Sequence, residues 1–415
     1  MLKKLLFISS LLAAGTSIYS QAISDSVTLG PGYANQVFYK ISDGTKTISS
    51  NTDWDLQFFS DLRSASIRTN NGVGVELYAT ASTDTTAFAT TTLDTSTLTL
   101  LRGGYASWET DAFTSQQTGH PNYGWGNYAG VGNIFGNKVY AIKLSSGVFK
   151  KIWINSIRTN GSLNFTTANL DGTNLVAKTL NRSAYSTKRH FYYDVENDSV
   201  LDAEPAKSAW ELVFRTYNDQ VGPLYYNVTG ALTNHGIEIS QVNNTAIATA
   251  RSNWSTYAVE SEINVIGNDW KNFNRMTSRF EITDSLSYII KDYNGDVYQL
   301  VFTGTSGGST GKMYFTKELI SMVSLEENTP LANFGIFPNP AVSNLTINFE
   351  LLKATESVNI TVIDVNGRIV KTINNDFEGQ GFQTVNANVS GLNAGIYFVR
   401  VQAGNSLVTK KFIKQ

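Results

Sequence analysis

The sequence predicts an all-β protein. Apolar and polar residues alternate in many short runs, such as Val37–Ile41, Trp54–Phe58 and Val297–Phe302, and this period places alternate side chains on one face of a strand. The 3.6-residue period of an amphipathic helix is almost absent. The chain also holds 20 tyrosines and 22 phenylalanines, and aromatic residues favour strands. Since the chain has 415 residues, we expect several antiparallel β-domains.

Residues 1–21 have the organisation of a secretory signal peptide. Lys3 and Lys4 form a basic start, Leu5–Ala14 form an apolar segment, and Ser20–Ala22 supply small residues at the exit. The apolar segment is too short to span a bilayer, and no later run approaches the roughly 20 apolar residues of a transmembrane helix. We therefore expect export into the periplasm and no transmembrane span.

Composition excludes several classes of protein. There is no cysteine, so disulfides, thiolate metal sites and lipoprotein attachment are excluded. The net charge of −2 shows no excess of positive charge of the kind that binds nucleic acid. Gly304–Gly308 fits the G-x-S-x-G pattern of hydrolases, but no histidine follows it, and that site needs a later histidine. We read this segment as a hairpin loop and expect a protein that is not an enzyme.

The central part of the chain contains the same unit twice. We expect two β-domains of one topology, at residues 25–175 and 188–325, followed by a linker at 326–333. The paired landmarks are Phe38-Tyr39 with Phe191-Tyr192, Trp54-Asp55 with Trp210-Glu211, Thr69–Gly72 with Thr233–Gly236, Trp108 with Trp254, Trp125 with Trp270, and Tyr140–Gly147 with Tyr288–Gly295.

Each unit resembles the HmuY family of haem-binding proteins. The resemblance rests on the Trp-acidic pairs, on Arg68–Gly72 and its relative Thr233–Gly236, and on the late hairpins that begin at Tyr140 and Tyr288. It implies antiparallel β-domains that bind haem through axial side chains. The family members are known as lipoproteins, whereas this chain lacks the cysteine for that attachment.

The resemblance also implies candidate haem ligands. The family places them in the loops on either side of the tryptophan that precedes the late hairpin. These loops hold His120 ahead of Trp125 and Met276 after Trp270, with Tyr123 as an alternative oxygen ligand. Neither unit offers a histidine or methionine at both places. Haem is therefore the candidate cofactor, and haem or haemoproteins are candidate partners. The alternative is a surface adhesive or glycan-binding β-protein without a haem ligand.

The last 82 residues, 334–415, hold four ordered motifs. Val358–Ile363 and Ile369–Ile373 alternate as strands do, and Asn366-Gly367 between them favours a two-residue turn in which both residues have positive φ. We expect a small antiparallel β-sandwich. The motifs are Pro338-Asn339-Pro340, Asp364–Arg368 with Asn366 and Gly367, Leu392–Tyr397 with Gly395, and the tail pair Lys410-Lys411.

These motifs resemble the type A sorting domain carried by cargo of the type IX secretion system in Bacteroidetes-type bacteria. The resemblance implies that residues 334–415 are a partner of the type IX secretion machinery. It also implies that the chain reaches the cell surface or the medium, where the domain is removed. It does not indicate what the exported body binds.

Overall fold

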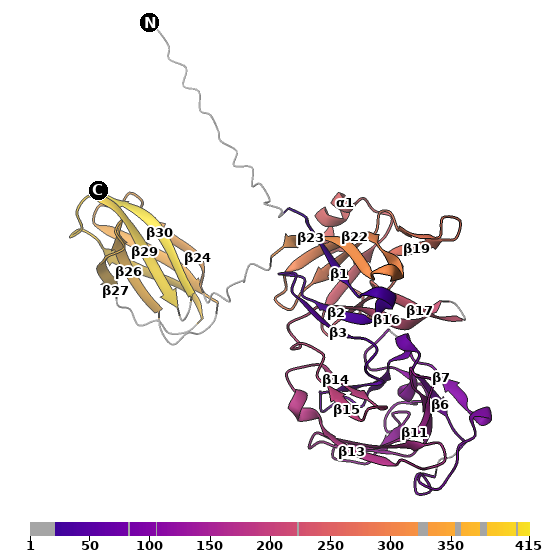
Figure 1. Ribbon diagram of the computed structural model, residues 1–415. Coiled ribbons are helices and arrows are strands. Elements are labelled where there is room, and N and C mark those ends of the chain that lie inside the picture. Colours follow the sequence, from indigo (N-terminus) through magenta and orange to yellow (C-terminus); the bar gives the residue numbers. More distant parts are fainter. Residues whose placement is uncertain are drawn as a thin grey trace. The chain divides into compact units, whose positions relative to one another are not determined.

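The computed structural model describes residues 21–81, 84–104, 106–221, 224–322, 331–352, 358–373, 380–403 and 406–415. The expected signal peptide, apart from residue 21, and most of the expected linker lie outside the described residues. The chain forms two compact units, residues 1–322 and 323–415, which we call the body and the C-terminal unit (Figure 1). Both are built of antiparallel sheets, so the all-β prediction is confirmed.

The body has two halves, each with its own hydrophobic core. One core lies within residues 56–195, and we call residues 54–205 the contiguous half. The other core joins residues 27–41 to residues 212–315, and we call residues 21–52 with 206–322 the split half. Its strands therefore come from the beginning and the end of the body.

The contiguous half contains a four-stranded sheet in the order β15-β14-β4-β5 and a larger sheet in the order β13-β12-β11-β10-β6-β7, on which β9 pairs with β11 and β8. The strands are β4 (Leu56–Phe59), β5 (Ile67–Thr69), β6 (Glu76–Ala79), β7 (Thr99–Leu101), β8 (Gly126–Tyr128), β9 (Ile134–Gly136), β10 (Tyr140–Lys143), β11 (Phe149–Ile157), β12 (Ser162–Asn169), β13 (Val176–Asn181), β14 (His190–Asp194) and β15 (Ser199–Leu201).

The split half repeats this arrangement, with sheets in the orders β3-β2-β16-β17 and β1-β23-β22-β21-β18 and a separate hairpin of β19 and β20. The strands are β1 (Ile23–Thr28), β2 (Asn35–Tyr39), β3 (Lys46–Ser50), β16 (Leu212–Val221), β17 (Leu224–Thr233), β18 (Glu238–Val242), β19 (Lys271–Asn274), β20 (Arg279–Ile282), β21 (Ser287–Lys291), β22 (Val297–Thr305) and β23 (Lys312–Ser321).

Helical segments in the described body are short and lie in the connections. They are α1 (Ile247–Ser252) and the 3-10 turns η1 (Pro31–Tyr33), η2 (Asn71–Val73), η3 (Thr95–Thr97), η4 (Ala112–Thr114), η5 (Arg182–Tyr185), η6 (Trp254–Thr256) and η7 (Gly307–Ser309).

The halves exchange hairpins. The hairpin β2–β3 lies in the first sequence repeat, yet β2 pairs with β16 of the second repeat, with Val213 opposite Phe38. The hairpin β14–β15 lies in the second repeat, yet β14 pairs with β4 of the first, with Phe191 opposite Phe58. Strand pairing therefore crosses the boundaries expected at residues 25–175 and 188–325. A repeat period reveals the length of the unit, but it does not reveal which copy receives a given hairpin.

Equivalent tryptophans lie at the two exchange points. Trp54 precedes β4, is 1% exposed, and has its ring centre 4.8 Å from that of Tyr192. Trp210 precedes β16, is 0% exposed, and lies 5.0 Å from Phe38 in an edge-to-face pair. Each tryptophan thus packs against the hairpin that comes from the other sequence repeat. The two tryptophans occupy the same place in the two halves. Phe38 corresponds to Tyr192, so the expected pairing of Phe38-Tyr39 with Phe191-Tyr192 was wrong by one residue.

The acidic residue that follows each tryptophan accepts a hydrogen bond from the backbone of the same hairpin, just after its first strand. Asp55 Oδ2 accepts a hydrogen bond from the Val195 N–H, and Glu211 Oε2 accepts one from the Ile41 N–H, both at 2.8 Å. Burial raises the pKa of both carboxyl groups, that of Asp55 to about 6. We call each Trp-acidic pair with its hairpin contacts a clamp.

An asparagine completes each clamp. Asn70 Nδ2 donates to the carbonyl of Trp54, and Asn234 Nδ2 donates to the carbonyl of Trp210, both at 2.9 Å. Both asparagines are at most 2% exposed. Because a buried amide left without partners is costly, these residues specify the loop that follows β5 and β17. This explains why Thr-Asn recurs in both sequence repeats.

The C-terminal unit is a sandwich of two sheets, ordered β24-β25-β28 and β27-β26-β29-β30. Both sheets contribute to one core, which includes Ile347, Phe349, Val362 and Val401. The strands are β24 (Leu331–Phe337), β25 (Asn344–Leu351), β26 (Val358–Asp364), β27 (Ile369–Ile373), β28 (Gly381–Asn388), β29 (Gly395–Ala403) and β30 (Ser406–Lys414).

The turn at Asn366-Gly367 differs from the expected one. Gly367 has φ of +79°, but Asn366 is not among the described residues with positive φ. The Asp364 carboxylate accepts the N–H groups of Asn366 at 2.9 Å and Arg368 at 3.0 Å. This favours a three-residue loop with glycine in its last, left-handed position. The prediction of a two-residue turn was wrong because it did not include the aspartate.

Removing either clamp tryptophan should destabilise the body by a similar amount. We expect Trp54→Ala and Trp210→Ala each to lower the free energy of unfolding by about 3–5 kcal/mol, since both rings are fully buried. Denaturant unfolding of the mature chain measures this. Trp254→Ala is the control, because Trp254 is half-buried, and it should cost less. A large loss for one clamp and none for the other would contradict their equivalence.

The clamp at Asp55 should give the body a pH-dependent stability. A pKa of about 6 in the folded state, against about 3.9 when unfolded, means that the folded state holds more protons between these values. Stability from this group is therefore present below pH 4 and lost as the pH rises through 6. Asp55→Asn should remove this loss, on the order of 2 kcal/mol. The control is Asp53→Asn, at an exposed neighbour. Unfolding curves at pH 4 and pH 7 that change equally in both variants would refute the assignment.

Candidate functional site

The candidate haem ligands lie at separate places. His120 is exposed before the cis bond to Pro121, and its ring centre lies 4.8 Å from that of Tyr128. Tyr123 is half-buried and packs against the core of the contiguous half. Met276 is 95% exposed at the tip of the β19–β20 hairpin in the split half. His120 and Tyr123 belong to the contiguous half and Met276 to the split half, and haem ligation by them stays a prediction.

An open trough of about 590 Å³ crosses the outer face of the larger sheet in the contiguous half. It runs over β9, β11, β12 and β13. Alternation along β11 explains its composition, because Ile152 and Ile154 point into the core and leave Trp153 and Asn155 on the opposite face. The residues that characterise it are Phe135, Trp153, Asn155, Asn164, Thr166 and Thr179.

Hydrogen bonds between neighbouring strands orient the polar side chains of the trough. Thr166 Oγ1 donates to Asn155 Oδ1 at 3.0 Å, and Thr179 Oγ1 donates to Asn164 Oδ1 at 2.7 Å. Asn164 Nδ2 donates in turn to Ser156 Oγ at 2.9 Å. The first of these bonds orients the amide of Asn155, which is half-exposed. This amide carries two N–H donors.

Flat side chains flank this polar row. The Trp153 indole donates to the carbonyl of Gly136 at 3.2 Å and is half-exposed. Phe135 is 40% exposed, and the guanidinium of Arg158 lies 5.2 Å from its ring centre. The residues that line this part of the described sheet include no carboxylate. The charged side chains of the trough are Arg158 and Lys178, and its amide and hydroxyl groups lie beside the two aromatic side chains.

The sequence carries a signal for this surface outside its motifs. The outward positions of β11, β12 and β13 hold Asn, Ser and Thr. A half-buried strand shows the same alternation whether its outer face is merely solvated or forms a site. The register that aligns Ser156, Asn164 and Thr179 across three strands, with Asn155 at the bulge beside Ser156, becomes visible only in the structure.

In the C-terminal unit, the sorting motifs meet at the final strand. Asn339 Nδ2 donates to the carbonyl of Lys411 at 3.2 Å, and Asn339 Oδ1 accepts the Ile413 N–H at 2.9 Å. The Pro338-Asn339-Pro340 segment has cis bonds before both prolines. Lys410 and Lys411 are exposed, and Lys410 Nζ donates to the carbonyl of Phe334 at 3.0 Å. Motifs about 70 residues apart in the sequence therefore form one edge.

The comparisons with known proteins agree with this geometry. The model of the family described as "Secretion system C-terminal sorting domain" matches residues 335–415. These residues are a sorting domain. No curated protein matches the chain.

One similar solved structure is that of PorZ, described as a surface component of the type-IX secretion system of Porphyromonas gingivalis. It shares 12% identity, with a TM-score of 0.16, over 78% of this chain and 44% of PorZ. The chain thus spans less than half of PorZ, and a likeness of this size does not establish a shared fold.

The sorting domain indicates that the protein is secreted or displayed at the cell surface, through the type IX secretion machinery. Among the described residues, no helix has the length and apolar character needed to cross a membrane. The resemblance of the two body repeats to the HmuY family stays a prediction.

Removing the sorting domain should stop export without unfolding the body. The cores of the body draw their described residues from positions 27–315, and the core of the C-terminal unit draws its own from 341–412. Deletion of residues 334–415 should therefore leave a folded, protease-resistant body in the periplasm. Cell fractionation and immunoblotting measure this. Wild-type amounts of the truncated body in the medium would contradict the prediction.

Proposed function

We propose that this protein is a non-enzymatic glycan-binding protein that acts outside the cell and holds uncharged sugar chains in the trough on β9, β11, β12 and β13. The observation that carries the proposal is the row of amides and hydroxyls on β11, β12 and β13, which lies beside Phe135 and Trp153. Sugars present hydroxyl groups around apolar C–H faces. Amide and hydroxyl side chains exchange hydrogen bonds with the former, and aromatic rings cover the latter.

The shape of the trough supports a chain-like ligand, and its charge disfavours a cationic one. The trough is open along its length rather than closed, so a ligand longer than one sugar ring fits without burial of its ends. Lys178 is paired with Asp198 at 2.8 Å, which leaves Arg158 as the cation nearest to the aromatic edge. Because carboxylates are absent from the described lining, nothing in the trough selects for a cationic ligand.

The central test is the Asn155 amide. We expect Asn155→Ala to weaken binding of neutral tetrasaccharides about tenfold, which is the loss of one or two hydrogen bonds. Cellotetraose, mannotetraose and chitotetraose, titrated calorimetrically into the mature chain, are the probes. Asn272→Ala is a matched control, because Asn272 is an exposed strand residue whose amide donates to Thr283 at 3.1 Å outside the trough.

Two outcomes would overturn the proposal. The first is that none of the probes binds saturably. The second is that Asn155→Ala and Asn272→Ala bind equally well. Hemin titration separates the haem-binding alternative, since an axial ligand gives a sharp Soret band that His120→Ala or Met276→Ala should change. Stoichiometric hemin binding that depends on those residues would favour that alternative.

A further inference from the structure

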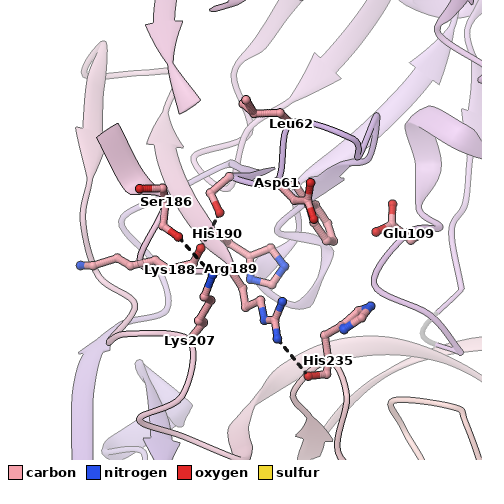
Figure 2. A pocket seen from close by; sticks show the side chains of 11 residues that line it. Asp61, Leu62, Glu109, Ser186, Lys188, Arg189, His190, Lys207 and His235 are labelled. Carbon is pink, nitrogen blue, oxygen red and sulfur yellow. Dashed lines mark hydrogen bonds between the residues drawn. The ribbon is translucent and has the colours of Figure 1, made fainter. Parts of the chain in front are cut away.

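A second cavity, distinct from the trough, lies at the junction of the two halves of the body. Its volume is about 310 Å³, at the lower end of the range for small-molecule sites. The contiguous half contributes the segment after β4, from Phe59 to Leu62, and the segment that leads into β14, from Ser186 to His190. The split half contributes Lys207 and His235, and these residues are drawn in Figure 2.

The floor of this cavity holds a buried histidine with a fixed tautomer. His190 is 2% exposed, and its Nδ1 lies 2.8 Å from Glu204 Oε2. The Glu204 carboxyl also accepts the Arg189 N–H at 2.8 Å and the Tyr192 hydroxyl at 3.2 Å. A carboxylate with these partners acts as an acceptor, so Nδ1 of His190 carries a proton. This leaves Nε2 as the nitrogen available to a ligand.

Nε2 of His190 has no hydrogen-bond partner within the described part of the chain, and it is buried. The ring cannot swing away to find one, because Phe59 packs edge-on at 4.5 Å and Trp108 lies 5.0 Å away. A buried polar group without a partner costs on the order of 1–3 kcal/mol. The fold therefore holds an unpaired imidazole nitrogen in a residue of the cavity wall.

Two cationic side chains, Arg189 and Lys207, also line this cavity. Arg189 Nη2 donates to the carbonyl of His235 at 3.3 Å, while its Nε is buried and has no partner in the described ranges. Lys207 Nζ donates to the carbonyl of Ser186 at 3.4 Å. Within the described residues, neither cation lies in an ion pair.

The carboxylates of the cavity, Asp61 and Glu109, accept hydrogen bonds from the segment Arg63–Ser64. Asp61 Oδ1 accepts the Arg63 N–H at 2.9 Å, and Glu109 Oε2 accepts the Ser64 hydroxyl at 2.8 Å. Figure 2 shows Glu109 on the opposite side of the group from Lys207. The cavity thus has a cationic side at Arg189 and Lys207.

We propose that this cavity binds the anionic group of a small ligand, a carboxylate or a phosphate, between Nε2 of His190 and the guanidinium of Arg189. An anion accepts hydrogen bonds, so the ring binds it with protons on both nitrogens, and the Glu204 carboxylate compensates the positive charge. Charge-assisted hydrogen bonds of this kind are the strong ones. The inference does not depend on glycan binding in the trough.

The other half of the body supplies a natural reference for this position. Asp55 accepts a hydrogen bond from the Val195 N–H, and Glu211 accepts one from the Ile41 N–H, so Val195 and Ile41 occupy equivalent positions. His190 lies five residues before Val195, and Gln36 lies five residues before Ile41. His190 therefore corresponds to Gln36. Gln36 is 0% exposed, and its amide donates to Ser49 Oγ at 3.2 Å. Glutamine is therefore compatible with this strand position, and His190→Gln should fold.

The test is calorimetric titration of the mature chain with inorganic phosphate and with acetate, in a zwitterionic buffer. We expect one equivalent of at least one probe to bind, and the two titrations distinguish a phosphate site from a carboxylate site. His190→Gln and Arg189→Gln should each weaken binding about tenfold or more. Arg275→Gln is the control, because Arg275 is exposed on the β19–β20 hairpin.

Thermal unfolding checks that each variant is folded. If His190→Gln does not fold, Arg189→Gln still decides the question. The proposal is overturned if neither probe binds saturably, or if both cavity variants bind as tightly as Arg275→Gln.

Discussion

The architecture of the body depends on the reciprocal exchange of two hairpins, each secured by a tryptophan and a buried carboxyl group. Trp54 and Asp55 secure β14 and the residues after it, and Trp210 and Glu211 secure β2 in the same way. Each sheet at the junction therefore combines strands from both sequence repeats. The burial of the carboxyl groups is unfavourable by itself, since it raises their pKa. That cost is offset by the aromatic packing and by the backbone hydrogen bonds.

Both candidate binding surfaces follow from this arrangement, although in different ways. The junction cavity exists because β14 approaches the split half and carries His190 with it. The trough lies on the larger sheet of the contiguous half, away from the exchanged strands. The pairing of β11, β12 and β13 positions the polar side chains of the trough. A shift of one residue in that register would send the amide row into the core.

Much of the fold was predictable from local patterns. The alternating runs at Val358–Ile363 and Ile369–Ile373 correspond to β26 and β27, and the sorting motifs identified the C-terminal unit. The turn at Asn366 was predicted wrongly, because a carboxylate two residues earlier selected a different loop. The partner of each hairpin was beyond prediction, since both copies offer the same strand. His190 carried no motif, and its significance depends on Glu204, Phe59 and Trp108, which only the tertiary structure assembles.

The order of the strands along the chain has a consequence for how the body is made. A chain that emerges N-terminus first presents β1 and the hairpin β2–β3 long before the strands that they join, since Ile23 pairs with Lys317 and Phe38 with Val213. The contiguous half can fold once β15 has been synthesised. By contrast, β2 keeps an unpaired edge until β16 has been synthesised, and β1 keeps one until β23 follows. Contacts between residues this distant in sequence slow folding, and unpaired strand edges promote aggregation. The leading strands are thus the part of a nascent chain that most needs the protection of a chaperone.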